Sequence, residues 1–228
     1  MIDSAPFFLA LQSGYSEVTI ALFHGDRCID TAIEHNKQAS KNLIPVIDTL
    51  LKRNSLTLTD CAFFAAYQGP APFTTLRVVI ATINGLAFAS SIPLIGVDGL
   101  LTFLNQERDD TYDFTVVLLN AFCESVYFGI YETKTGHIIT GCEEIAQFLS
   151  DIAQRSSDPR CKFVGNGTLL YQNQILEKLK KSYIPQPTPE LCSIETVGKQ
   201  AYKQWQLQEN ITQQLAPLYL KKFTITSA

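Results

Sequence analysis

The sequence predicts an α/β protein with two lobes, each built from a mixed sheet flanked by helices. At 228 residues the chain is long enough for two lobes that each bury a core. Short apolar stretches typical of strands alternate along it with amphipathic stretches typical of helices. The first three strand-like stretches follow one another through short loops before the first helix begins. Because 46% of the residues are hydrophobic and 18% are charged, the composition is that of an ordinary globular protein.

The first part of the chain predicts a run of strands, then a helix, then another strand. The sequence QSGY at 12–15 and the Gly25-Asp26 pair are turn signals. Ser40 is a candidate N-cap for the helix, and Pro45 suits only the first turn, so the regular helix is expected to begin late. The expected strands are 7–11, 17–23, 27–33 and 62–66, and the expected helix is 38–54.

The stretch GPAPFTTLRVVIATINGLAFASSIPLIGV at 69–97 predicts a turn, a long helix and a short buried strand. Thr74 or Thr75 could cap this helix through a side-chain hydroxyl. Apolar residues recur at helical spacing and define one face for burial. Ala81, Gly85 and Ala89 form a second stripe. Because glycine inside a helix costs about 1 kcal/mol relative to alanine, we expect another backbone to approach Gly85 closely.

The second half of the chain predicts a second lobe of strands and helices. We expect residues 1–98 to form the first lobe, completed by the C-terminal segment 208–228, and residues 99–207 to form the second, smaller lobe. In the second half, helices are expected at 98–105, 143–156, 168–182 and 194–207, and strands at 114–120, 126–133, 137–140 and 162–164.

The long helix and its flanks resemble the signature of the bacterial TsaB (YeaZ) family, which reads GPGSFTGLRxGxxxAKGLA followed by IPLxGVSSL. The match covers nearly thirty residues with the same internal spacing. This resemblance implies an actin-like ATPase fold, whose first lobe opens with three consecutive strands and a helix. The residues that carry the loop and helix part of the signature, to which we assign a structural role, are Gly69, Pro70, Phe73, Thr74, Arg77 and Gly85.

The chain departs from this pattern at positions where such folds handle nucleotides. The first hairpin of an actin-like lobe holds an aspartate for the metal, and this chain has Gln12, whose neutral amide supplies no charge for a divalent cation. Ala71, Pro72 and Thr75 replace small residues and glycines of the loop, and proline lacks an N–H group for a phosphate. We therefore expect no catalytic residue and no metal site in this chain.

The resemblance implies a noncatalytic subunit that binds the catalytic protein TsaD, with the ATPase TsaE joining transiently. Together they place a threonylcarbamoyl group on an adenosine of ANN-decoding tRNAs, with ATP and a metal held by the partner and tRNA reached only through the complex. The partner surface is expected on helices 40–51 and 74–88, and the same surface could form a homodimer. The expected contact residues are Leu43, Ile47, Leu50, Leu51, Thr75, Val79, Ile83 and Leu86.

Composition and charge narrow the remaining function classes. A net charge of −4 disfavours tight direct binding of tRNA, which depends on basic residues. We expect no membrane span and no signal peptide, hence a cytoplasmic protein. The six cysteines are scattered singly, so we expect free thiols, and the three histidines lack the HxxxH spacing of zinc proteases.

Two other functions remain open on the sequence. The first is an active kinase of a small metabolite with the same fold, which would bind ATP with magnesium. A binding assay that compares the chain with its Gln12→Asp variant separates this alternative from a noncatalytic subunit. The second is a metalloprotease, against which the histidine spacing argues.

Overall fold

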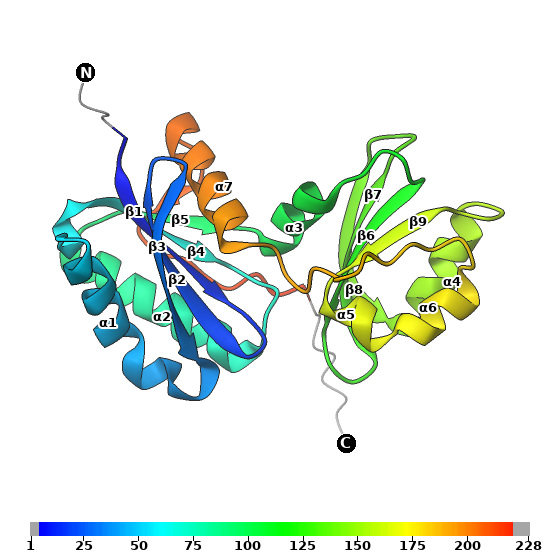
Figure 1. Cartoon of the computed structure of the whole chain (residues 1–228), viewed down its shortest axis with the longest axis horizontal. Coiled ribbons are helices and arrows are strands. Elements are labelled where there is room, and N and C mark those ends of the chain that lie inside the picture. The colour runs from blue at the N-terminus through cyan, green and yellow to red at the C-terminus, as the bar shows by residue number, and fades with distance from the viewer. Residues whose placement is uncertain (1–4, 221–228) are drawn as a thin grey trace. The chain divides into compact units, whose positions relative to one another are not determined.

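The computed structural model describes residues 5–220, which form two compact units (Figure 1). The first unit runs to Gly99 and also contains Ser193–Leu218, whereas the second contains Leu100–Cys192 together with Tyr219 and Leu220. Of the segment 208–228 that was expected to complete the first lobe, residues 208–218 do so. The boundary after residue 98 therefore agrees with the expectation to within one residue. The expectation that the helix at 194–207 belongs to the second lobe is wrong, because this helix packs in the first unit. Residues 221–228 of the expected C-terminal segment lie outside the described residues.

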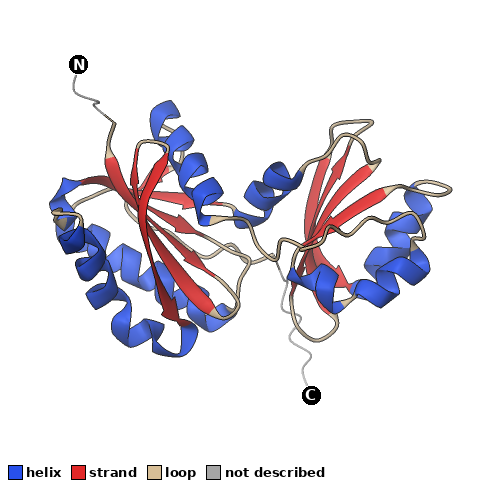
Figure 2. Ribbon diagram, in the orientation of Figure 1, coloured by secondary structure: helices blue, strands red, loops and turns tan. Residues whose placement is uncertain are grey.

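The first unit contains a six-stranded mixed sheet in the order β10-β5-β4-β1-β2-β3. Strands β1 and β4 and strands β4 and β5 are parallel, and the other neighbours are antiparallel. The sheet is covered on both faces, by α1 and α2 on one side and by α7 on the other (Figures 1 and 2). Its elements are β1 (Phe7–Ser13), β2 (Glu17–His24), β3 (Arg27–His35), α1 (Asn36–Arg53), η1 (Leu58–Asp60), β4 (Cys61–Tyr67), α2 (Phe73–Ser90), β5 (Leu94–Val97), α7 (Ile194–Leu207) and β10 (Ile211–Thr212).

The second unit contains a four-stranded mixed sheet in the order β8-β7-β6-β9, in which β6 and β9 are parallel. It follows the same plan as the first: three antiparallel strands, a helix, and a strand parallel to the first of the three. The helix expected at 168–182 is in fact two helices separated at Tyr171. The elements are α3 (Gly99–Glu107), β6 (Phe114–Asn120), β7 (Ser125–Glu132), β8 (Ile138–Glu144), α4 (Ile145–Arg155), β9 (Cys161–Val164), α5 (Asn166–Leu170) and α6 (Gln172–Lys178).

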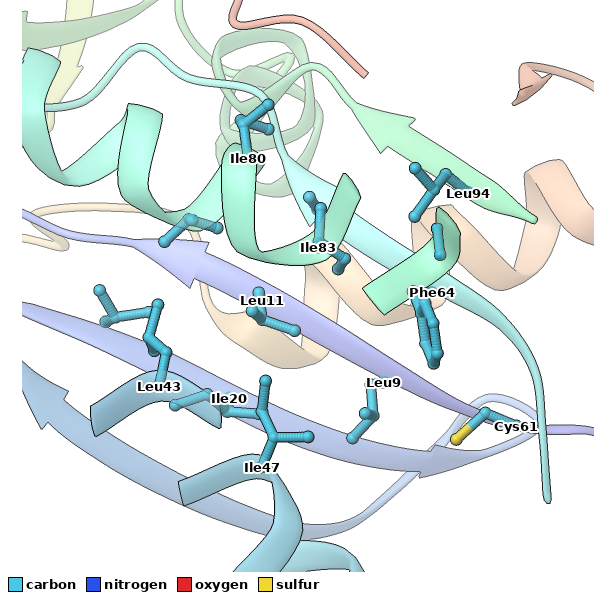
Figure 3. Packing of buried hydrophobic residues seen from close by; sticks show 14 of the residues in the cluster. Leu9, Leu11, Ile20, Leu43, Ile47, Cys61, Phe64, Ile80, Ile83 and Leu94 are labelled. Carbon is cyan, nitrogen blue, oxygen red and sulfur yellow. The ribbon is translucent and has the colours of Figure 1, made fainter. Parts of the chain in front are cut away.

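The core between the first sheet and helices α1 and α2 is continuous and apolar (Figure 3). Leu9, Leu11 and Ile20 of the sheet face Leu43 and Ile47 of α1, and all five side chains are almost fully buried. α1 begins at Asn36 after an N-cap at His35, so the expected cap at Ser40 is wrong. The helix also continues through Pro45, which lies on its exposed side.

One helix of the described chain, α2, has the length and hydropathy of a membrane-spanning segment. Its buried side chains, among them Leu76, Val79 and Ile83, belong to the core shown in Figure 3. A helix that buries one face in a core meets the same test of length and composition.

The opposite face of the first sheet holds α7 through stacked aromatic rings. Phe8 stacks on Phe23 and Phe63, at ring-centroid distances of 4.9 and 4.3 Å. Trp205 of α7 stacks on Phe63 at 4.8 Å. Gly198 gives α7 its close approach, because a Cβ atom at this position would lie 2.1 Å from the Phe23 ring.

Replacing each of two mid-helix glycines with alanine should change the stability of the protein in opposite directions. Gly198→Ala should lower the free energy of unfolding by about 1–3 kcal/mol, because the added methyl overpacks against a buried ring. Gly85→Ala should raise it by up to about 1 kcal/mol, because a Cβ at Gly85 would meet no atom within 4 Å and alanine favours the helix. Chemical denaturation of the two variants beside the wild type measures both values. A stable Gly198→Ala variant would contradict the close packing of α7.

A polar network ties the end of α1 to strand β3. The Arg53 guanidinium donates to Asp30 Oδ1 at 2.6 Å and also to the Thr31 carbonyl, and Asn54 Nδ2 donates to Asp30 Oδ2 at 2.7 Å. The hydrogen bond from Arg53 lowers the pKa of the Asp30 carboxyl, with a smaller opposing effect from burial.

This network should make the stability of the protein depend on pH in the acid range. Because the pKa of Asp30 is lower in the folded than in the unfolded state, its contribution is complete above the unfolded pKa and is lost as pH falls through the folded one. Replacing Arg53 with methionine should flatten this dependence. Unfolding titrations of the variant and the wild type between neutral and acid pH test it, and identical pH profiles would contradict it.

Candidate functional site

The residues expected to contact a partner lie mostly inside the first unit. Seven of the eight are buried, and six of these belong to the core of Figure 3. Leu86 alone is partly exposed. Because the seven buried side chains are at most 6% exposed, they offer a partner almost no surface, and their assignment as contact residues is corrected. The buried residues are Leu43, Ile47, Leu50, Leu51, Thr75, Val79 and Ile83.

The physical reason is that α1 and α2 lie side by side on one face of the sheet. Each helix therefore has two neighbours, the sheet and the other helix. The apolar stripes on α1 and α2 are wider than packing on the sheet alone requires. Most of the additional apolar residues pack between the two helices.

The exposed face of α2 carries a different set of residues. Thr74, Arg77, Ala81, Gly85 and Phe88 are all exposed and are spaced three or four residues apart, so they form one stripe along the helix. The Phe88 side chain is 90% exposed. The side chains in the middle of the stripe, Ala81 and Gly85, are small, and the stripe ends at the exposed ring of Phe88. We call these five residues the α2 outer face.

A groove lies along α1, between this helix, residues 56–58 and Leu86 of α2. It has a volume of 230 Å³ and is lined mainly by apolar side chains, including Ile44, Leu51, Leu58 and Leu86. Ile44 is 58% exposed. Partly exposed apolar surface therefore also occurs on the α1 side of this helix pair.

The loop before α2 is held by its backbone and by Tyr67. Gly69 has a φ of +111°, a conformation that favours glycine. Its carbonyl accepts a hydrogen bond from the Gly99 N–H at 3.0 Å. The buried Tyr67 hydroxyl donates to the Pro70 carbonyl at 2.9 Å. These contacts fix the chain where it turns from β4 into α2.

The start of α2 differs from the expected capping. The helix begins at Phe73, the N-cap position is Pro72, and no side chain caps it, so the expectation of a Thr74 or Thr75 cap is wrong. The Arg77 guanidinium instead lies 3.5 Å from the centre of the Phe73 ring. Thr74 belongs to the α2 outer face, and Thr75 is buried.

The hairpin between β1 and β2 places Gln12 at the end of β1. Gln12 pairs with Thr19 and is 5% exposed. The neighbouring Ser13 is fully buried, and its hydroxyl has no hydrogen-bond partner. Within residues 5–220, the structure contains no group of three His, Cys, Asp or Glu side chains arranged to hold a metal ion.

The glycine turn of the second unit has a packing role. A Cβ atom at Gly165 would lie 2.1 Å from the Leu118 carbonyl oxygen, and one at Gly167 would lie 3.0 Å from the same strand. Asn166 Oδ1 accepts a hydrogen bond from the Asn120 N–H at 3.0 Å. The turn thus fits tightly against β6.

The six cysteines are free, as predicted. Burial raises the pKa of the Cys61 thiol to about 12 and that of the Cys161 thiol to about 12. Both thiols are therefore protonated at neutral pH and are poor nucleophiles.

The loop before α2 yields a prediction about the Tyr67 hydroxyl. Tyr67→Phe should lower the free energy of unfolding by about 1–3 kcal/mol, because the Pro70 carbonyl is buried and loses its donor. Tyr183→Phe is the matched control, since Tyr183 is 47% exposed, and should change stability by less than about 0.5 kcal/mol. Chemical denaturation measures both, and equal effects would show that the Tyr67 bond contributes nothing specific.

Comparisons with known proteins point to one family. A family model described as TsaD, tRNA N6-adenosine threonylcarbamoyltransferase, matches residues 33–222. The protein named tRNA threonylcarbamoyladenosine biosynthesis protein TsaB of Buchnera aphidicola subsp. Baizongia pistaciae is 20% identical over 224 residues, which cover 94% of this chain and 97% of the relative. The protein of the same name from Escherichia coli K12 is 25% identical over 146 residues, 63% of each chain.

A solved structure agrees with these relatives. The structure described as YeaZ from Pseudomonas aeruginosa superposes with a TM-score of 0.68 at 22% identity, covering 94% of this chain and 100% of that one. The resemblance to TsaB (YeaZ) proteins, predicted from the sequence, is confirmed, and so is the α/β class with two mixed sheets flanked by helices.

Proposed function

The chain belongs to the family described as TsaD, tRNA N6-adenosine threonylcarbamoyltransferase, and from this membership we propose that it is a noncatalytic partner subunit in threonylcarbamoyladenosine biosynthesis. Its partner would be a catalytic TsaD homologue. This chain would supply a docking surface, and the chemistry on tRNA would take place on the partner. The relatives named TsaB, one of them aligned over nearly the full length of both chains, support this division of roles.

The observation that carries the proposal is the α2 outer face. A phenyl ring that is 90% exposed gains about 1.5–3 kcal/mol when it becomes buried. The small residues Ala81 and Gly85 would let a partner helix approach closely beside that ring. The cost of glycine inside this helix is not recovered by any packing contact of Gly85 in the described chain. A docked helix would supply such a contact.

The residues at the usual nucleotide positions fit a noncatalytic role. Gln12 offers an amide where a metal-bound nucleotide calls for a carboxylate. Pro70 and Pro72 in the loop before α2 have no N–H group to offer a phosphate. ATP and its metal would therefore bind to the partner.

The wider assembly follows from the same proposal. A TsaE homologue would join transiently, and tRNA would be reached through the complex, since a net charge of −4 gives this chain little attraction for phosphates. In the absence of its partner, the α2 outer face could pair with that of a second copy. The complex would work in the cytoplasm, away from membranes.

The test is to mix the chain with the TsaD homologue of its own genome and to measure binding by calorimetry and size-exclusion chromatography. Phe88→Asp should weaken the complex by about 2 kcal/mol, roughly thirtyfold in Kd, because it places a carboxylate in a buried contact. It should leave the unfolding free energy of the chain unchanged within about 0.5 kcal/mol, because the ring is exposed.

Phe122→Asp is the matched control. Phe122 is 53% exposed and lies in the second unit, so its replacement should leave the affinity unchanged. Equal affinities of the Phe88→Asp variant and the wild type would show that the partner binds elsewhere. No complex with the wild type, together with no gain in tRNA threonylcarbamoylation when the chain is added to TsaD and TsaE, would overturn the proposed function itself.

A further inference from the structure

A polar hollow lies in the first unit, at the carboxyl ends of the parallel strands β4 and β5. It has a volume of 460 Å³ and is bounded by the end of α7 and by the chain segment that follows it. Pockets of 300–1,000 Å³ are of the size that holds small molecules, and the carboxyl ends of strands are where open α/β sheets bind them. The polar residues that line the hollow are Gln68, Asp98, Gln204, Asn210, Thr212 and Gln214.

Gln204 is a polar residue at a buried position of α7, where an apolar side chain would pack at lower cost. It continues the buried stripe of α7 formed by Ile194, Val197 and Ala201, and it is 8% exposed. Its Oε1 atom has no hydrogen-bond partner. Leaving a buried amide oxygen unpaired costs about 1–3 kcal/mol, a cost that leucine at the same position would avoid. The side chain lines the hollow, so a donor group placed there is the natural partner for this amide.

Gln68 is held in place from two sides. Its Nε2 atom donates to the Ala216 carbonyl at 2.8 Å. Its side chain crosses Gly96 so closely that a Cβ at that position would lie 2.2 Å from Gln68 Oε1. Because the nitrogen is committed to Ala216, the carbonyl oxygen is the atom directed over Gly96. Gly96 and Gln68 together thus present a fixed acceptor at the wall of the hollow.

The charged and polar groups that line the hollow indicate which kind of ligand it could bind. Asp98 is its one ionisable residue, and none of the lining residues is Lys, Arg or His. A phosphate or carboxylate ligand would find no cation there. Amide oxygens and one carboxylate suit a ligand that is rich in N–H donors and carries no negative charge.

We propose that this hollow is a binding site for a small organic amine, whose ammonium or guanidinium group donates hydrogen bonds to Asp98 and to the amides of Gln68 and Gln204. The site lies apart from the α2 outer face and does not rest on the proposed function. A ligand held there would link α7 and the segment after it to the ends of β4 and β5.

The test is an NMR titration of the ¹⁵N-labelled chain with agmatine, with inorganic phosphate as the anionic control. Agmatine should produce saturable shifts in the side-chain amide signals of Gln68 and Gln204, and phosphate should not. Asp98→Asn keeps the shape of the side chain and removes its charge, so it should weaken agmatine binding about tenfold.

Gln204→Leu separates a binding role from a packing role. It should raise the free energy of unfolding, because it removes the unpaired amide, and it should also weaken agmatine binding. Gln206→Leu, an exposed change on the same helix, is the matched control and should leave binding unchanged. Absence of saturable shifts, equal shifts with phosphate, or unchanged agmatine affinity in both the Asp98→Asn and Gln204→Leu variants would overturn the proposal.

Discussion

The first sheet must be covered on both faces, and the rest of the first unit depends on this constraint. Residues 8–13 of β1 and residues 63–67 of β4 are buried without interruption, although neighbouring side chains of a strand point to opposite faces. Helices α1 and α2 cover one face, and the other requires a further helix. The chain supplies it after completing the second unit, when it returns as α7 and stacks Trp205 on Phe63.

The sequence predicted the local elements better than it predicted which helix covers which sheet. Strand β6 and helix α7 were predicted with their observed bounds, since each has a strong local pattern between clear breaks. The place of α7 was not predicted, because periodicity shows that a helix has a buried face without showing which sheet covers it. The aromatic partners Phe8, Phe63 and Trp205 are distant in sequence, and only the fold brings them together.

The sequence pattern did not show which residues of α1 and α2 are exposed. The periodic apolar residues of α1 and α2 are core residues, because the two helices also pack on one another. Part of the exposed face was predicted as the stripe of Ala81, Gly85 and Ala89, but nothing in the sequence indicated that the Phe88 ring at its end is exposed. The helix starts were mistaken for a similar reason. Rules for caps favour Ser and Thr, but the N-cap residues are His35 and Pro72, and neither helix start has a side-chain cap. At the start of α1, the Asn36 N–H instead donates to the Ser16 carbonyl at 3.1 Å.

The glycine turns that follow β4 and β9 are equivalent features of the two units. Gly69 follows β4 and Gly165 follows β9, and both strands are parallel to the first strand of their own unit. Their φ angles of +111° and +101° are alike, so the turns are equivalent features of a repeated plan. Each has a packing cause within its own unit, since a Cβ would approach Leu76 in one and Leu118 in the other. Glycine at these positions is therefore required by the fold whether or not a phosphate binds. What such a fold needs in addition is a charged group in the first hairpin, and the chain has Gln12 there. The same backbone plan, with its glycines, is thus present in a chain whose first hairpin has a neutral amide at this position.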